Sequence, residues 1–150
     1  MFGFQELSIP TQLHNKIRNK NITQFIYPLK RIGFLRLSKN ISLSLIEQAE
    51  EKISEVESQL NLAKEKDFSE FDLLHKEFLK NMVDLMEEKL DESKINLDKA
   101  KTFFENEEYF YASDHAYLSA NIASIIPRQV NNILEGRTKE DWNRVEAIEN

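Results

Sequence analysis

The stretch from residue 46 to residue 63, IEQAEEKISEVESQLNLA, repeats its apolar residues with the spacing of a coiled coil. The steps between them alternate between three and four residues, which places them on one side of an α-helix. The stretch holds about two and a half heptads, fewer than the three or four that identify a coiled coil standing alone. We therefore expect it to pack on the following helix of the same chain, with self-association of two chains as the alternative. This seam consists of Ile46, Ala49, Ile53, Val56, Leu60 and Ala63.

The sequence around the seam lacks helix breakers, since neither glycine nor proline occurs from Phe34 to Ile126. Such a run favours long helices joined by polar turns. We expect one helix to begin near Asn40–Ser42 and the next at Asp67, where Glu70 completes an acidic capping box. The next apolar stripe predicts one long helix, or two helices with a break near residues 92–94. Its residues are Phe71, Leu74, Phe78, Met82, Met86, Leu90, Ser93, Leu97, Ala100 and Phe104.

The C-terminal part of the chain continues the helical pattern. Residues 109–126 are apolar on nearly every side, which predicts a helix buried among others. Pro127 is suited to the first turn of a new helix and Gly136 to its end. Thr138 is expected to cap a short last helix, with Asp141 at its third position. The sequence therefore predicts an all-α bundle of five to seven helices, in which long antiparallel helices form a coiled-coil-like hairpin.

Charge divides the chain into two parts. The 150 residues carry a net charge of −6, but residues 1–40 are at +6 and residues 41–150 at −12. We expect a small basic, aromatic N-terminal arm over residues 1–40 and an acidic helical bundle over residues 41–150. Within the arm, Pro28 predicts the end of a short amphipathic helix, and residues 29–37 fit either a β-hairpin or a second short helix.

The basic arm is the candidate binding site. Its cations are interleaved with aromatic residues, a combination that suits an acidic protein surface, or the phosphates and bases of a nucleic acid. The acidic bundle of the same chain is a third candidate partner. The candidate binding residues are Lys16, Arg18, Lys20, Phe25, Tyr27, Lys30, Arg31, Phe34, Arg36 and Lys39.

Motifs for catalysis are sparse. The chain has no cysteine, which excludes disulfides, zinc–thiolate sites and thiol nucleophiles, and it has no glycine-rich phosphate loop. Asp72 and His75 stand one helical turn apart, as metal ligands often do, but a di-iron bundle needs two such motifs and two further glutamates. A metal-dependent enzyme built on this pair, with Asp114 and His115, is the weakest alternative. We expect no metal, no cofactor and no catalysis.

No apolar run approaches the roughly 20 residues that cross a bilayer, and no signal peptide is visible. We therefore expect a cytoplasmic protein. Its expected role is that of a non-catalytic assembly or adaptor subunit of a larger complex, which docks a protein partner through the basic arm. The alternative role is a nucleic-acid-binding accessory subunit of a replication, repair or RNA-guided complex.

Residues 97–125 carry a local resemblance to a known type of domain. A lysine-rich helix there ends in a short polar turn at Asn106, and a helix with regularly placed tyrosines and alanines follows. This arrangement resembles the helical hairpins of tetratricopeptide-like and HEPN-like domains. The resemblance implies a packing unit for protein–protein or protein–RNA assembly. It does not imply a nuclease, because no arginine here is followed four to six residues later by histidine, as in the ribonuclease-active HEPN proteins.

Overall fold

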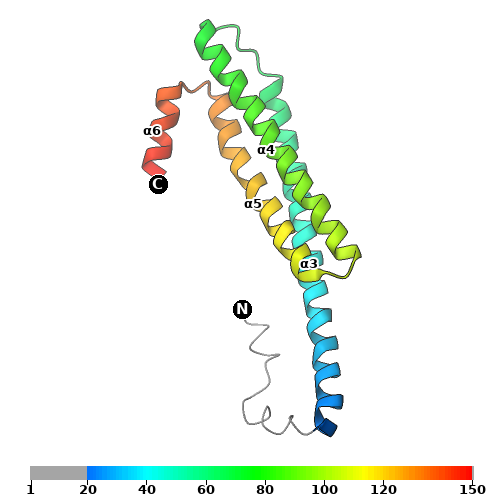
Figure 1. Ribbon diagram of the computed structural model, residues 1–150. Helices are drawn as coiled ribbons and strands as arrows, with labels where there is room; N and C mark the ends of the chain where they lie inside the picture. The colour runs from blue at the N-terminus through cyan, green and yellow to red at the C-terminus, as the bar shows by residue number, and fades with distance from the viewer. Residues whose placement is uncertain (1–19, 150) are drawn as a thin grey trace.

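The computed structural model describes residues 20–149, and these residues form an all-α helical bundle without strands (Figure 1). This confirms the fold class predicted from the sequence. The described part contains four helices, where five to seven were predicted for the chain. With the labels of Figure 1, they are α3 (Lys20–Lys64), α4 (Leu73–Glu105), α5 (Tyr109–Leu134) and α6 (Lys139–Glu149).

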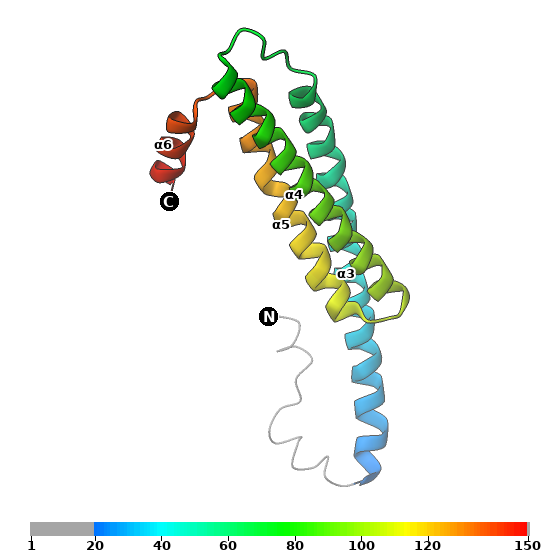
Figure 2. The ribbon, with the colours of Figure 1, turned by 45° about the horizontal axis from the view of Figure 1, so that its top comes forward.

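Three long helices form the body of the molecule. α3 and α4 run antiparallel, α5 returns antiparallel to α4, and α6 turns back at the upper end (Figures 1 and 2). All six residues of the Ile46–Ala63 seam are buried, as expected for packing within one chain. α3 packs more extensively on α5 than on α4, so the seam does not face the following helix alone. Since these side chains are already covered, the seam offers nothing for the alternative, self-association of two chains.

Ion pairs between α3 and α4 fix the register of the two helices. The three paired positions on each helix are seven residues apart, so the pairs recur at every second turn beside the seam. A slip of one heptad would bring Lys64 opposite Lys94 in one direction and opposite Lys80 in the other. Each exposed pair contributes only about 0.2–1 kcal/mol, but every slipped register loses pairs and gains repulsion. The pairs are Lys101–Glu50 at 2.5 Å, Lys94–Glu57 at 2.6 Å, and Lys64–Glu87.

Small side chains let α4 and α5 approach closely. Ser93 and Ser119 are fully buried, and each hydroxyl donates a hydrogen bond of 2.7 Å to the other residue's carbonyl oxygen. The two hydroxyls are themselves 3.1 Å apart. Such reciprocal bonds satisfy buried polar groups on both helices and require a short distance between their backbones. The predicted alanine stripe of α5 lies along this buried side, with Ala112, Ala116 and Ala123 fully covered and Ala120 partly covered.

The first helix boundaries differ from those predicted. α3 begins at Lys20 and not near Asn40–Ser42, and it continues through Pro28 and Gly33. The helix end at Pro28 was therefore wrong. Of the two alternatives for residues 29–37, the β-hairpin was wrong, and the helical one is right in type, although these residues belong to α3 and not to a separate short helix. Ser42 lies inside α3, where its buried hydroxyl lies 2.6 Å from the carbonyl oxygen of Ser38 and 3.1 Å from that of Tyr109. The expected boundary at residue 40 thus falls within a continuous helix.

The start of α4 was also predicted too early. The carboxylate of Asp67 accepts hydrogen bonds from the backbone N–H and hydroxyl of Ser69, and these bonds lower its pKa. Asp72 is the residue that caps α4, because it accepts the backbone N–H of His75 at 2.9 Å. From there α4 runs unbroken to Glu105, so the single long helix is confirmed. Leu74, placed in its apolar stripe, is exposed.

The C-terminal helices agree in part with the prediction from the sequence. Pro127 lies inside α5 and does not begin a new helix. An internal proline costs about 3 kcal/mol, which burial of Ile126, Val130 and Ile133 on both sides offsets. Gly136 follows the end of α5 with φ 65°, as predicted for a stop residue. The predicted Thr138 cap of α6 is confirmed, because its hydroxyl accepts the backbone N–H of Asp141.

The two described glycines should respond oppositely to alanine. Gly136 has a positive φ, and a Cβ there would lie 2.5 Å from Cζ of Phe71, so Gly136→Ala should lower the free energy of unfolding by about 1–3 kcal/mol. At Gly33, in α3, a Cβ meets nothing within 4 Å, so Gly33→Ala should increase helicity. Urea unfolding and far-UV circular dichroism measure the two effects. Equal stability of both variants would contradict the assigned stop at Gly136.

Candidate interaction surfaces

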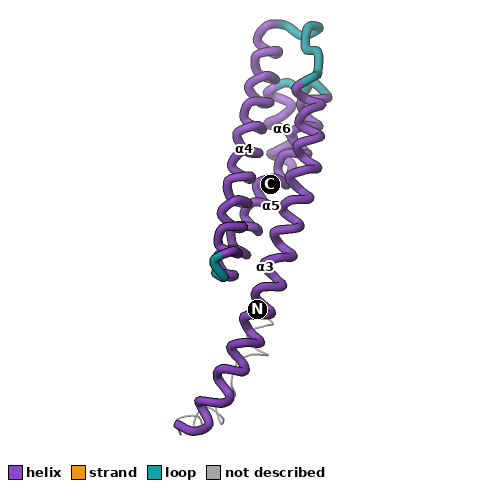
Figure 3. Tube along the Cα trace, turned by 90° about the vertical axis from the view of Figure 1, so that its right-hand side faces the viewer, coloured by secondary structure: helices purple, strands orange, loops and turns teal. Residues whose placement is uncertain are grey.

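α3 continues well beyond the three-helix body. Ser42 lies level with Tyr109, the first residue of α5, so residues 20–41 project past the α4–α5 turn (Figures 1 and 3). At 1.5 Å per residue this segment, which we call the α3 extension, is about 33 Å long. From Lys20 to Ile46 the sequence contains five cations and no carboxylate. The extension is therefore a basic helix directed away from the acidic body.

The structure places the predicted binding residues on this extension as far as it describes them. Arg36 and Lys39 are exposed and form no ion pair with any other described residue. The described carboxylates of the chain therefore do not neutralise these two side chains. Lys16 and Arg18 lie outside the described residues. The other six lie within α3, and the structure does not describe their side chains. They are Lys20, Phe25, Tyr27, Lys30, Arg31 and Phe34.

A second surface lies between α4 and α5. It consists of Ile95, Phe103, Tyr111, Leu118 and Ile125, which we call the α4–α5 patch. Phe103 is half-buried, and the other four side chains are 45–54% exposed. Tyr111, Leu118 and Ile125 are seven residues apart and therefore share one side of α5. Large contiguous apolar surface is unusual on a monomer and commonly marks an interaction site.

Contacts between aromatic rings connect the two helices of this patch. The rings of Phe103 and Tyr111 are 5.4 Å apart, and Phe103 stacks on His115 at 5.3 Å. His115 in turn lies 3.1 Å, Nδ1 to Oδ1, from Asn96. Together with the Ser93–Ser119 bonds, these contacts set the antiparallel register, in which Ile95 and Leu118 lie at about the same level of the two helices. The patch is therefore one continuous strip along both helices.

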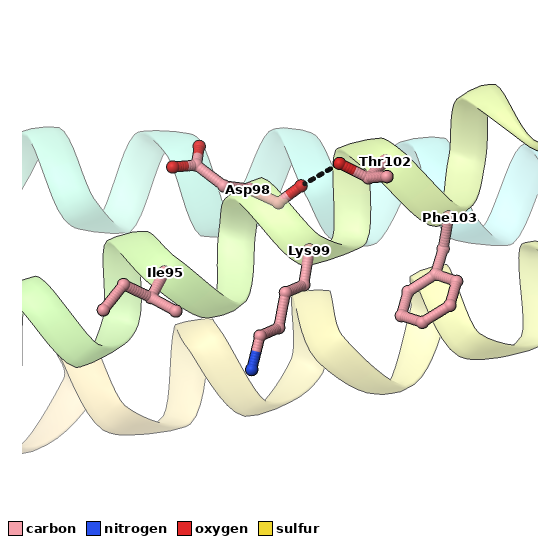
Figure 4. A pocket seen from close by; sticks show the side chains of 5 residues that line it. All are labelled: Ile95, Asp98, Lys99, Thr102 and Phe103. Carbon is pink, nitrogen blue, oxygen red and sulfur yellow. Dashed lines mark hydrogen bonds between the residues drawn. The ribbon is translucent and has the colours of Figure 1, made fainter.

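A shallow depression of about 330 Å³ opens on the α4 side of the patch. Figure 4 shows Ile95, Lys99 and Phe103 pointing from α4 toward α5, with Asp98 and Thr102 on the other flank. The Thr102 hydroxyl donates to the carbonyl oxygen of Asp98, an ordinary helix contact. Its exposed surface is mostly apolar, with polar atoms from one cation, one carboxylate and one hydroxyl, which suits a side chain of another protein segment better than a polar small molecule.

The surroundings of the patch are anionic. Residues 88–114 contain eight carboxylates and four lysines. Three of the lysines are already engaged, Lys89 by Glu92 on the same helix, and Lys94 and Lys101 by α3. Lys99 alone remains to balance the other carboxylates of this segment. A cationic partner segment therefore matches the charge around the patch.

α6 already packs on the same side of α4. Trp142 is only 3% exposed, and its ring meets Phe78 edge-on at a centroid distance of 5.6 Å. Phe78 precedes Phe103 by about seven helical turns, so both side chains lie on one side of α4. The upper end of this side thus receives a helix from the chain itself, and the α4–α5 patch is its uncovered continuation.

Sequence reasoning missed the patch because residues 109–126 were expected to be buried on every side. The structure buries the alanine side together with Ser119, Ile122 and Ile126, and it leaves large apolar residues exposed on the other side. A signal was present in the sequence. Asp114, Asn121 and Arg128 are seven residues apart and exposed, and their spacing marks the outward side of α5.

The residues of the alternative metal-dependent enzyme make structural contacts. The Asp72 carboxylate caps α4, and the His75 ring packs on Phe71 at 4.4 Å with Nε2 3.3 Å from the carbonyl oxygen of Arg137. His115 contacts Asn96 and Phe103, while Asp114 is exposed on another side of α5. Over residues 20–149, no three metal-ligating side chains come together.

None of the described helices is long and apolar enough to cross a membrane. No protein-family model matches the sequence, and neither a curated protein nor a solved structure is significantly similar to it. The resemblance of residues 97–125 to tetratricopeptide-like and HEPN-like hairpins therefore stays a prediction.

The packing of α6 can be tested with the single tryptophan of the chain. Because Trp142 is buried against Phe78, its fluorescence should resist quenching by acrylamide. Phe78→Ala removes the edge-to-face contact, which contributes about 0.5–1.5 kcal/mol in addition to the burial of apolar area. The variant should raise quenching toward that of a free tryptophan. Phe110→Ala, at an exposed aromatic residue of α5, is the control and should leave quenching unchanged. Equal quenching of folded and urea-unfolded protein would contradict the contact.

Proposed function

We propose that this chain is a non-catalytic assembly subunit that docks a protein partner through the basic α3 extension. The observation that supports this most directly is the extension itself, a helix about 33 Å long that leaves the bundle with five cations and no carboxylate. Helices need tertiary packing for most of their stability, so an isolated projecting helix gains from a partner that covers it. The bundle then serves as the rigid base.

The chemistry of the extension favours an acidic protein surface. Its cations steer association with a negative partner, and its apolar residues supply area to bury. They include Ile26, Leu29, Ile32, Phe34 and Leu35. A nucleic-acid partner would use the same cations on phosphates, but the carboxylates of the body would oppose a long polyanion beside it.

Charge reversal on the extension tests this function. The full-length chain is recovered from its native extract with its bound proteins, and these are quantified by mass spectrometry. The variant Arg36→Glu with Lys39→Glu should lose its specific partner at least about tenfold, since both side chains are exposed and unpaired among the described residues. The matched control, Lys66→Glu with Lys80→Glu, makes the same charge change at exposed sites in the opposite half of the molecule and should retain the partner.

Two results would contradict the proposal. Equal recovery of all proteins by both variants, with untagged copies of the chain itself counted among them, would remove the extension as a docking site. The second contradicting result is retention of nucleic acid instead of protein. Its affinity should then fall as salt rises, with a slope of about −0.9 for each phosphate contacted in a plot of log affinity against log salt concentration. In that case the nucleic-acid role replaces the protein-docking role, and changing Lys30, Arg31 and Arg36 to alanine should flatten the slope.

A further inference from the structure

The α3 extension and the α4–α5 patch are complementary surfaces within one chain. The extension is cationic and carries apolar residues. The patch is apolar, and its segment of the chain carries carboxylates in excess over lysines. Binding of one to the other buries apolar area and pairs opposite charges in the same step.

The extension cannot reach the patch of its own chain while α3 remains one helix. α3 is continuous from Lys20 to Lys64, and below Ser42 it leads away from the end of α5 (Figures 1 and 3). The patch lies in the other direction, from Tyr111 upward along α5. An α3 extension that covers the patch therefore comes from another molecule.

We infer that the partner of the extension is a second copy of this chain, with each copy placing its extension on the α4–α5 patch of the other. This rests on the function proposed above and names its partner. Each three-helix body then acquires a fourth helix, and the exchange closes at a dimer because the two contacts are related by a two-fold axis.

The dimensions and the existing packing agree with this arrangement. The patch runs from Tyr111 to Ile125, about 21 Å along α5, and the extension of about 33 Å spans it with residues left to cross between the bodies. α6 shows that this side of α4 accepts a helix, through the burial of Trp142 on Phe78. The exchanged extension would lie below α6 on the same side.

The first experiment measures association of the full-length chain by sedimentation equilibrium at low and high salt. We expect a dimer that weakens as salt rises, because opposite charges contribute to it. Leu118→Asp places a carboxylate at the centre of the patch and should raise the dissociation constant at least about tenfold. Leu62→Asp, at an exposed leucine of α3 outside the patch, is the matched control and should leave it unchanged.

The second experiment identifies which surfaces meet. Since the chain has no cysteine, single variants can be joined specifically. An equimolar mixture of Leu29→Cys and Leu118→Cys proteins, treated with a short bis-maleimide, should give the mixed cross-linked dimer. A mixture of Leu29→Cys and Leu62→Cys is the control and should not. Cross-linking of Leu118→Cys protein to itself would overturn the inference, because the copies would then meet patch to patch.

A monomer at all concentrations would also overturn the inference, without deciding the proposed function. If Arg36→Glu with Lys39→Glu still loses a different protein from the native extract, the extension docks a foreign partner and the function stands. If neither association depends on the extension, both proposals fail. The two experiments therefore separate the partner's identity from the docking role.

Discussion

The continuity of α3 is the constraint on which the rest of the structure depends. One helix supplies the buried seam from Ile46 to Ala63 and also the basic extension, so the rigid body and the projecting segment share a single axis. Were the chain broken near residue 40, the extension could fold back on the acidic body, and opposite charges would neutralise each other within one molecule. The unbroken helix keeps the basic extension apart from the acidic body. Arg36 and Lys39 stay exposed as a consequence.

The fold was predictable wherever a periodic pattern extended over many residues. The seam spacing identified a helix whose apolar side is buried within the chain, and the absence of glycine and proline identified long helices. Single-residue signals did worse. Asp67 had the residue type of a helix cap, but its carboxylate bonds Ser69 and leaves the capping to Asp72. Pro127 marked a helix start by its type alone, whereas burial on both sides holds it inside α5.

The candidate surfaces were predictable only in part, for a physical reason. Charge is read directly from sequence, so the basic segment was located, although its shape was not. Exposure of an apolar residue depends on how many neighbours surround its helix. α5 has apolar side chains all round, and the sequence does not say that, among the described helices, α3 and α4 supply most of its packing. With two main neighbours among the described helices, Tyr111, Leu118 and Ile125 remain about half exposed.

A docking surface that combines apolar area with opposite charges responds to the salt concentration in two ways. Salt screens the charges within a Debye length of about 8–10 Å, which slows encounter and weakens the polar rim. Salt leaves the apolar contact largely intact, since that term follows the area removed from water. A helix held mainly by charge would dissociate as salt rises, whereas one held mainly by area would persist. The extension and the patch contain both terms. In the proposed dimer, Leu118 at the centre of the patch would therefore supply the salt-insensitive part of the binding, and Arg36 and Lys39 would supply the salt-sensitive part.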